Sequence, residues 1–343
     1  MNVTELMKSM GHEQVVFCND PKSGYNGIIA IHSTRLGPAI GGTRLWLYAS
    51  GEEAVIDVLR LSRGMTYKNA VARIPLGGGK AVISADHTKV DREKLFRAHG
   101  RFVEGLAGRY ITAEDVGTSP ADMDYVRMET NHVAGLADGA GDPSPVTARG
   151  VFRAIQASAM YKWGSDDLSG RTVAVQGCGH VGLNLMRELK TAGAKLIITD
   201  INRELLDRAA REVAAVPVEP EAIYAADADV FAPCALGGIL NDATIAQLKA
   251  AIVAGAANNQ LLEERHGSAL EQRNILYAPD YVANAGGVLN GGIELLGWDR
   301  EYVKSRVDGI YDTLTSVFEI AKRDGVPTYK AADRLAEQRL NAA

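Results

Sequence analysis

Two lysines, Lys68 and Lys80, stand twelve residues apart in a stretch that could carry out proton transfer. Lys80 follows three glycines and precedes a short apolar run at residues 81–83, which is typical of a buried strand. Because burial or a second cation nearby lowers the pKa of a lysine, Lys80 is a candidate general base near neutral pH. The alternative is that both are surface lysines beside a flexible turn, since most lysines are exposed.

An acidic pair, Glu114 and Asp115, ends a short predicted strand in residues 109–120 (RYITAEDVGTSP). Asp115 then stands at the carboxyl end of the strand, where we expect it to face the lysines and relay protons. The alternative is a solvated loop carboxylate, because Pro120 and the acidic residues after it indicate a helix start.

The elements that must position these side chains follow from hydrophobic periodicity. Residues 37–46 (GPAIGGTRLW) contain so many glycines that their backbone amides could face a substrate, or they could form a hairpin turn. Alternation and apolar runs predict strands over residues 14–18 and 27–32, and the helical spacing predicts helices over residues 3–10, 52–63 and 91–106.

A glycine-rich turn in the second half of the chain has the spacing of a dinucleotide-binding motif. Residues 171–176 are a predicted strand, residues 177–182 (GCGHVG) match G-x-G-x-x-G, and a helix and a second strand ending in Asp200 follow. The glycines permit a tight turn close to a pyrophosphate, and the carboxylate binds ribose hydroxyls. Asp200 would repel a 2′-phosphate, which favours NAD over NADP, although Arg203 could accommodate that phosphate. Without a ligand, the motif would be a turn that packs strand on helix.

Further predicted strands at residues 230–232, 251–254 and 275–278 each lead into a loop of small or amide residues. Helical stretches separate them, which indicates a parallel sheet wound on both faces. In such a sheet ligands bind outside the carboxyl ends of the strands, so these loops should line one crevice. Asn258, Asn259 and Asn284 lie in them, either in polar roles or as turn formers. Two helices, over residues 302–321 and 327–340, complete the chain.

Length and composition set limits on the protein class. A chain of 343 residues fits two domains, and 46% hydrophobic with 23% charged residues is ordinary for a soluble globular protein. The net charge of -5 gives no reason to expect nucleic acid or a membrane as partner. No apolar run is long enough to span a bilayer. The scattered Cys18, Cys178 and Cys234 predict free thiols in the cytoplasm, and neither they nor the seven histidines have metal-ligand spacing.

The sequence resembles the family of NAD-dependent amino-acid dehydrogenases that includes leucine, valine, phenylalanine and tryptophan dehydrogenases. The resemblance covers nearly the whole chain and rests on these stretches: LGPAIGGTRLW, LSRGMTYKNA, PLGGGKAVI, ITAEDVGT, PVTARGVF, VAVQGCGHVG, FAPCALGGILN, AGAANNQL and YAPDYVANAGG. It implies two α/β domains with a cleft between them. The expected boundaries are a substrate-binding and oligomerisation domain at residues 1–138 completed by the helix at 327–343, a linker at 139–146, and a Rossmann-type doubly wound domain at 147–326.

The resemblance also implies roles for individual residues. Lys68 would hold the substrate carboxylate, Lys80 would be the general base, and Asp115 would share in proton transfer. Gly41 and Gly42 would lie against the substrate, together with Asn259 from the cofactor domain. Thr147 would meet the nicotinamide carboxamide. The other residues expected to contact NAD are Gly177, Cys178, Gly179, His180, Val181, Gly182, Asp200, Ala235, Leu236, Ala256, Ala257, Asn258 and Asn284.

The implied reaction is the reversible oxidative deamination of an L-amino acid to a 2-oxo acid, ammonia and NADH, by a homo-oligomer. The side-chain pocket would be formed by Ile40, Ala113, Val288 and Gly291. Gly291 replaces a larger apolar residue, so we expect activity on aliphatic and aromatic amino acids, with a preference for a bulky side chain such as that of phenylalanine or tryptophan. A leucine or valine dehydrogenase proper is the alternative.

Three other readings remain open at this point. A glutamate dehydrogenase would need a cation for the side-chain carboxylate, which neither Ile40 nor Gly291 provides. An amine dehydrogenase would lack the carboxylate-binding lysine, whereas Lys68 is present. A non-catalytic NAD or amino-acid sensor would have no need of the proton relay that Lys80 and Asp115 imply.

Overall fold

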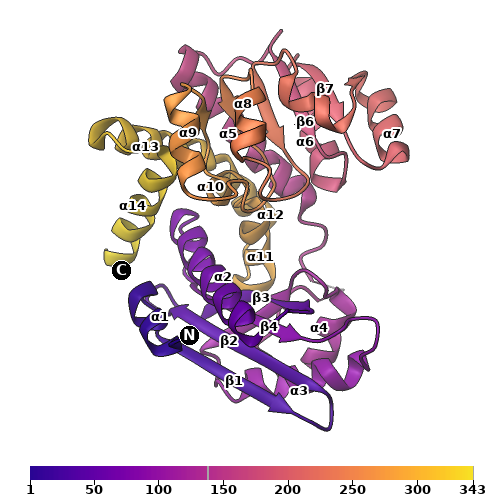
Figure 1. Cartoon of the computed structure of the whole chain (residues 1–343), viewed down its shortest axis with the longest axis vertical. Coiled ribbons are helices and arrows are strands. Elements are labelled where there is room, and N and C mark those ends of the chain that lie inside the picture. The colour runs from indigo at the N-terminus through magenta and orange to yellow at the C-terminus, as the bar shows by residue number, and fades with distance from the viewer. Residues whose placement is uncertain (137–138, 343) are drawn as a thin grey trace. The chain divides into compact units, whose positions relative to one another are not determined.

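The computed structural model describes residues 1–136 and 139–342, and the chain divides into two compact units (Figure 1). The first unit contains Met1–Gly141, Gly291–Gly297 and Ala336–Ala343, and the second contains Asp142–Asn290 and Trp298–Leu335. Residues 291–297 were expected in the cofactor domain, but they group with the first unit. The domain end expected at residue 138, and residue 343 of the expected final helix, lie outside the described residues.

The first unit is built on a five-stranded sheet in the order β1-β2-β4-β3-β5. β2 runs antiparallel to both β1 and β4, whereas β4, β3 and β5 are parallel to one another. The strands are β1 (Gln14–Asp20), β2 (Tyr25–Ser33), β3 (Ala39–Trp46), β4 (Gly77–Ser84) and β5 (Tyr110–Glu114).

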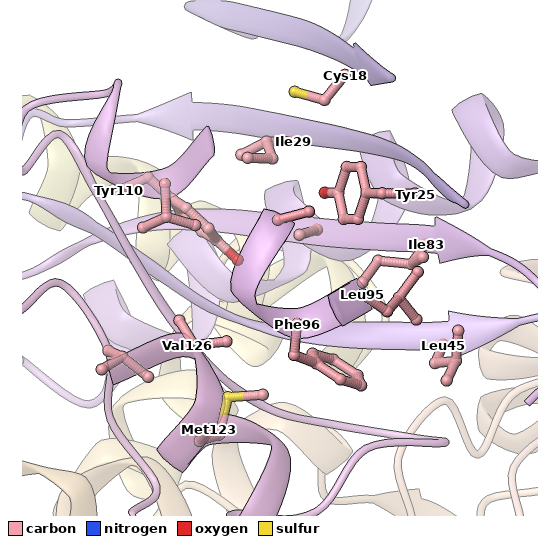
Figure 2. Packing of buried hydrophobic residues seen from close by; sticks show 14 of the residues in the cluster. Cys18, Tyr25, Ile29, Leu45, Ile83, Leu95, Phe96, Tyr110, Met123 and Val126 are labelled. Atoms are coloured by element: carbon pink, nitrogen blue, oxygen red, sulfur yellow. The ribbon is translucent and has the colours of Figure 1, made fainter. Parts of the chain in front are cut away.

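Helices cover both faces of this sheet. α1 and α2 pack against Ile28, Ala30 and Val82 on one face. α3 and α4 pack on the other face, where Figure 2 shows Leu95 and Phe96 in one cluster with strand residues. These helices are α1 (Val3–Met10), α2 (Gly51–Val71), α3 (Arg92–Glu104) and α4 (Pro120–Arg127).

Two glycine-rich segments, for which a turn was the alternative expectation, are strands. Residues 77–79 begin β4, so the strand starts before the predicted apolar run at residues 81–83 and Lys80 lies inside it. Glycine is required there by close packing, since a Cβ on Gly78 would lie 2.1 Å from the Thr66 amide nitrogen of α2. Similarly, Gly41 and Gly42 lie within β3. α2 also continues well past residue 63, so that it carries Lys68 in its last turn.

The second unit contains a six-stranded sheet in the order β11-β10-β9-β6-β7-β8, in which every pair is parallel. Burial of such a sheet by helices on both faces is the Rossmann-type arrangement. The strands are β6 (Thr172–Gln176), β7 (Lys195–Thr199), β8 (Val216–Pro217), β9 (Val230–Pro233), β10 (Ile252–Val253) and β11 (Leu276–Tyr277).

The helices of the second unit follow the strands in alternation. A cluster that includes Phe231 and Val253 packs the sheet against η1, α8 and α9. The long helix expected over residues 302–321 is two helices, because Gly309 interrupts it. The helices are α5 (Ser144–Trp163), α6 (His180–Thr191), α7 (Arg203–Val213), η1 (Pro220–Ala225), α8 (Asp242–Gln247), α9 (Arg265–Gln272), α10 (Asp280–Ala283), α11 (Gly286–Leu296), α12 (Arg300–Asp308), α13 (Ile310–Asp324) and α14 (Thr328–Asn341).

Two of these helices, α11 and α14, have residues in both units. α5 begins at Ser144, so the last residues of the expected linker form its first turn. Among the described helices, none is both long and apolar enough to cross a membrane.

Candidate active site

The face of the first sheet that α2 covers carries three of the predicted substrate residues, Ile40, Gly42 and Ala113, together with Lys80. Gly42 pairs with Ala113, and Ile40 pairs with Gly78, two positions before Lys80. Because neighbouring strand partners point to the same face and side chains alternate along a strand, these residues share one face. Gly41, one position away, belongs to the opposite face by the same alternation.

Lys80 and Asp115 form a buried ion pair on this face. The Lys80 Nζ lies 2.7 Å from the Asp115 Oδ2, and their side chains are 7% and 23% exposed. The absence of a side chain at Gly42 makes room for the carboxylate, since a Cβ there would lie 2.8 Å from the Asp115 Cβ. The Asp115 amide donates to the Thr118 hydroxyl at 2.7 Å, which fixes the turn after β5.

The surroundings of the pair shift both pKa values. Burial lowers the pKa of Lys80, and the attraction of Asp115 opposes that shift without cancelling it. Burial by itself would raise the pKa of Asp115, but the neighbouring Lys80 and Arg44 cations hold it below its usual value. Asp115 is therefore ionised across the neutral range, while Lys80 can release its proton more readily than an exposed lysine.

Lys68 lies in the last turn of α2, between two residues that face the glycine-rich strand. Thr66 packs against Gly78, and the Asn69 side-chain amide donates to the Gly77 carbonyl at 2.7 Å. The same turn is held by the end of the chain, because Arg339 donates to the carbonyls of Ala70 and Val71. Lys68 is thus carried by a helix end that is fixed on two sides.

Three residues that were not predicted extend the ion pair. The Arg44 Nε lies 3.4 Å from the Asp115 Oδ2, and an Arg44 terminal nitrogen lies 2.9 Å from the Asp57 Oδ2. The Tyr48 hydroxyl donates to the same Asp57 oxygen at 2.7 Å. Arg44 could have been noticed in the sequence as a cation two positions after Gly42, but its partner on α2 depends on how the helix packs on the sheet.

The glycine-rich turn of the second unit has the backbone features that a dinucleotide requires. Gly177 has φ of +104°, as a tight turn after β6 demands. Gly182 allows α6 to pack on that turn, since a Cβ there would lie 2.0 Å from the Gly177 carbonyl oxygen. At Gly179, by contrast, a Cβ would meet no described atom within 4 Å. The amino end of α6, where His180 and Val181 begin the first turn, therefore has space beside it for a phosphate group.

Asp200 is fixed at the end of β7 beside this turn. Its Oδ2 accepts the Cys178 amide at 2.7 Å, and its Oδ1 accepts the Asn202 amide at 2.7 Å. Arg203 is directed to other acids, with Asp207 at 3.6 Å and Glu219 at 3.5 Å. The carboxylate next to the turn is therefore oriented by backbone, while the nearby cation is engaged in exposed ion pairs.

The loops after β9, β10 and β11 contribute the remaining predicted cofactor residues of the second unit. Ala235 lies against the turn, 3.0 Å from a Cβ placed on Gly177, and Leu236 beside it is exposed. The buried Asn284 donates to the Ala256 carbonyl at 3.0 Å and to Asn258 at 2.8 Å. Its own Oδ1 is buried without a hydrogen-bond partner among the described residues. A bound group with a donor would satisfy that atom.

Other predicted residues are placed as follows. Thr147 lies in the first turn of α5, with its hydroxyl 3.2 Å from a Cβ placed on Gly287. Ala257 is buried, whereas Asn259 is exposed in a left-handed conformation. Val288 and Gly291 lie on α11, and the two units divide between them. The predicted residues thus form two groups, one in each unit.

No cluster of three or more acidic, histidine or cysteine side chains that could hold a metal ion occurs in residues 1–136 and 139–342. The three cysteines are free thiols. Each unit is therefore described by its own candidate residues: a charged pair with apolar neighbours in the first unit, and a glycine turn with a carboxylate in the second.

Both units match the profiles of known protein families. The profile of a family described as Glu/Leu/Phe/Val dehydrogenase, dimerisation domain, matches residues 12–132, and that of Glutamate/Leucine/Phenylalanine/Valine dehydrogenase matches residues 139–208 and 198–343. A leucine dehydrogenase of Thermoactinomyces intermedius is 57% identical, over 99% of this chain and 94% of that protein. An L-tryptophan dehydrogenase of Nostoc punctiforme is 51% identical, over 99% and 97%. A crystal structure of L-tryptophan dehydrogenase from Nostoc punctiforme superimposes with a TM-score of 0.90 at 49% identity, over 99% of this chain and 98% of that one.

Proposed function

Because the chain belongs to the Glu/Leu/Phe/Val dehydrogenase family and is an amino-acid dehydrogenase, we propose that it carries out the NAD-dependent, reversible oxidative deamination of an apolar L-amino acid. The observation that carries this proposal is the buried pair of Lys80 and Asp115, 2.7 Å apart, on the same sheet face as the apolar Ile40 and Ala113. A proton-transfer pair beside an apolar surface suits an amino acid whose side chain has no charge.

In the proposed reaction the two lysines have opposite protonation states. Lys68 stays charged and binds the substrate carboxylate. Lys80, in its neutral form, takes a proton from the water that adds to the substrate iminium, and Asp115 stabilises the ammonium that results. Collapse of the carbinolamine then releases ammonia and the 2-oxo acid. The low exposure of Lys80 favours this role, because burial makes its neutral form accessible.

The nucleotide supplies one chemical capability when bound, the acceptance of a hydride from the substrate Cα. The residues of the second unit fit such a group, with the glycine turn for the pyrophosphate, Asp200 for the ribose hydroxyls, and Asn284 with its unpartnered oxygen for a donor group. Since the Asp200 carboxylate is fixed in place and would repel a 2′-phosphate, we propose NAD and not NADP as the preferred nucleotide.

The substrate preference follows from Gly291. A Cβ at this position would have Leu295 as its nearest neighbour, at 3.9 Å, so the glycine leaves space that a larger residue could occupy. We therefore propose that the enzyme acts on bulky apolar amino acids, aromatic as well as branched-chain. The names of these relatives are consistent with either preference, since they are leucine, tryptophan and valine dehydrogenases. A hydrophobic pocket distinguishes such substrates by only about 1–3 kcal/mol per methylene, so overlapping activities are expected.

The test is NADH formation at alkaline pH with leucine, valine, phenylalanine, tryptophan, glutamate and an amine that lacks the carboxylate. Lys80→Ala should abolish turnover while NAD still binds. Lys89→Ala is the matched control, because Lys89 is an exposed lysine of the same unit. Turnover of glutamate or of the amine alone would contradict the proposed substrate class. NAD binding without turnover of any substrate would favour the sensor reading.

Assembly and location are proposed separately. The matching N-terminal family is described as a dimerisation domain, and we propose that this chain forms a homo-oligomer through its first unit. Light scattering after size exclusion would contradict this if the active protein eluted as a monomer. A cytoplasmic location, based on composition and free thiols, remains a prediction.

A further inference from the structure

We propose that Arg44 and Asp57 are positioning residues that set the proton equilibrium of the Lys80 and Asp115 pair. This inference rests on the proposed function, because it concerns how the same pair works. The two residues have opposite charges and come from β3 and α2, and the resemblance to known dehydrogenases implies no role for either.

Arg44 has one short and one long contact with a carboxylate. Its short contact, at 2.9 Å, is to Asp57, and its long contact, at 3.4 Å, is to the same Asp115 oxygen that Lys80 approaches at 2.7 Å. Asp57 is held in turn by the Tyr48 hydroxyl at 2.7 Å. Arg44 is therefore anchored away from Asp115 and leaves Lys80 as the principal partner of that carboxylate.

The charges explain why this arrangement matters for catalysis. With Lys80 protonated, Lys80, Arg44, Asp57 and Asp115 sum to zero, and with Lys80 neutral they sum to minus one. All four side chains are less than about a third exposed, so water screens them only partly. Loss of the Arg44 cation would make the net charge of both states more negative by one, so the proton on Lys80 would be harder to remove. Loss of Asp57 would have the opposite effect.

The other charged groups around the Lys80 and Asp115 pair keep their charge when Arg44 or Asp57 is replaced. The covering helix α2 carries three cations, Arg60, Arg63 and Lys68, of which Arg63 donates to the Tyr67 hydroxyl at 3.0 Å. Glu114 precedes Asp115 but belongs to the opposite face of β5 by strand alternation. Tyr48 stays protonated, because burial and its hydrogen bond to Asp57 raise its pKa. Among the described residues, Arg44 and Asp57 are therefore a cation and an anion that contact each other beside the pair and can be neutralised one at a time.

The experiment compares pH profiles of kcat and kcat/KM for amino-acid oxidation. The rate should rise with pH as Lys80 loses its proton, which gives each pH profile an ascending limb. In Arg44→Met this limb should move to higher pH by at least about half a unit, and in Asp57→Asn it should move to lower pH. Arg44→Lys keeps the charge and should restore the limb toward that of the wild type. These opposite shifts would not arise from a loss of packing.

The matched control is the Arg92 and Asp122 pair of the same unit, with a contact at 2.5 Å and a nearly buried aspartate. Arg92→Met should lower the unfolding temperature and leave the limb in place. Unshifted limbs in Arg44→Met and Asp57→Asn, or shifts in the same direction, would overturn the proposal. If Arg44→Met does not fold, Asp57→Asn and Arg44→Lys decide the question. Wild-type protein without turnover would instead refute the proposed function.

Discussion

The two units prepare for a ligand in opposite ways. The first unit uses side chains, because Lys80 and Asp115 are charged groups that the sheet and α2 remove from water. The second unit uses the backbone, because the turn after β6 depends on positions that have no side chain. Activity should therefore be sensitive to a change of charge at Lys80 and Asp115, and to a change of volume at the glycine turn.

The largest expected effect is that of Asp115→Asn, which removes one charge and almost no volume. We expect kcat to fall by about 10²- to 10⁴-fold, the range typical of a lost proton-transfer group. The ascending limb of the pH profile should also move to lower pH, because the carboxylate no longer stabilises the Lys80 ammonium. Steady-state kinetics across pH measure both. An unchanged kcat would mean that the ion pair is structural.

A change of volume is the corresponding test in the second unit. A Cβ at Gly182 would collide with the Gly177 carbonyl, so Gly182→Ala should weaken NAD binding by about tenfold or more, given that overpacking costs about 1–3 kcal/mol. Nucleotide binding by calorimetry measures this. Gly179→Ala is the control for the fold, because its added methyl meets no described atom and should leave the unfolding temperature unchanged. Undiminished NAD affinity in Gly182→Ala would contradict the backbone account.

Acid should lower the free energy of unfolding of the first unit, because it contains the buried histidine His99. His99 contacts Tyr25, Thr43 and Thr112 in the core, and burial lowers its pKa to about 3. Since the unfolded chain takes up a proton below about pH 6.5 and the folded chain does not, stability should fall on acidification by up to about 1.4 kcal/mol per pH unit until about pH 3.

Denaturant unfolding at several pH values measures this slope. His99→Gln should reduce the slope while lowering stability at neutral pH, whereas His87→Gln, at an exposed histidine of the same unit, should leave it unchanged. Equal slopes in the wild type and His99→Gln would show that this histidine does not link folding to pH.

The smallest effect expected is that of Asp200→Asn, the same charge removal as at Asp115 but in the second unit. We expect KM for NAD to rise by about tenfold with little change in kcat, since the lost group binds ribose and takes no part in proton transfer. Discrimination against NADP should weaken as well. A large fall in kcat with an unaltered KM would contradict the contrast between the two units.

The sequence predicted the glycine turn well because its signals are local. The strand, the G-x-G-x-x-G spacing and Asp200 lie within about thirty residues of chain, as the motif requires. Most of the helices and strands for which bounds were predicted agree with the structure to within a few residues, for the same reason. The break at Gly309 was missed because the apolar periodicity on either side of it continues in phase.

The charged group was predicted only in part because its members come from distant segments. Lys80 and Asp115 were identified by type and strand position, but Asp57 meets Arg44 only when α2 lies across the sheet. For the glycines of β3 and β4 a turn was left open as the alternative, since composition alone does not show whether glycines form a turn or allow close packing within a sheet. Long-range packing is the information that single-sequence patterns lack.

The glycines at the start of β4 also limit how the protein could be altered for use as a biocatalyst. Added methyl groups there would collide with Ser33, Thr66 or Tyr110, so a mutant library that includes residues 77–79 would consist largely of misfolded variants. Gly291 has no such close neighbour. Randomising it together with Ile40 and Ala113 should change which amino acids are accepted while leaving the proton-transfer residues undisturbed.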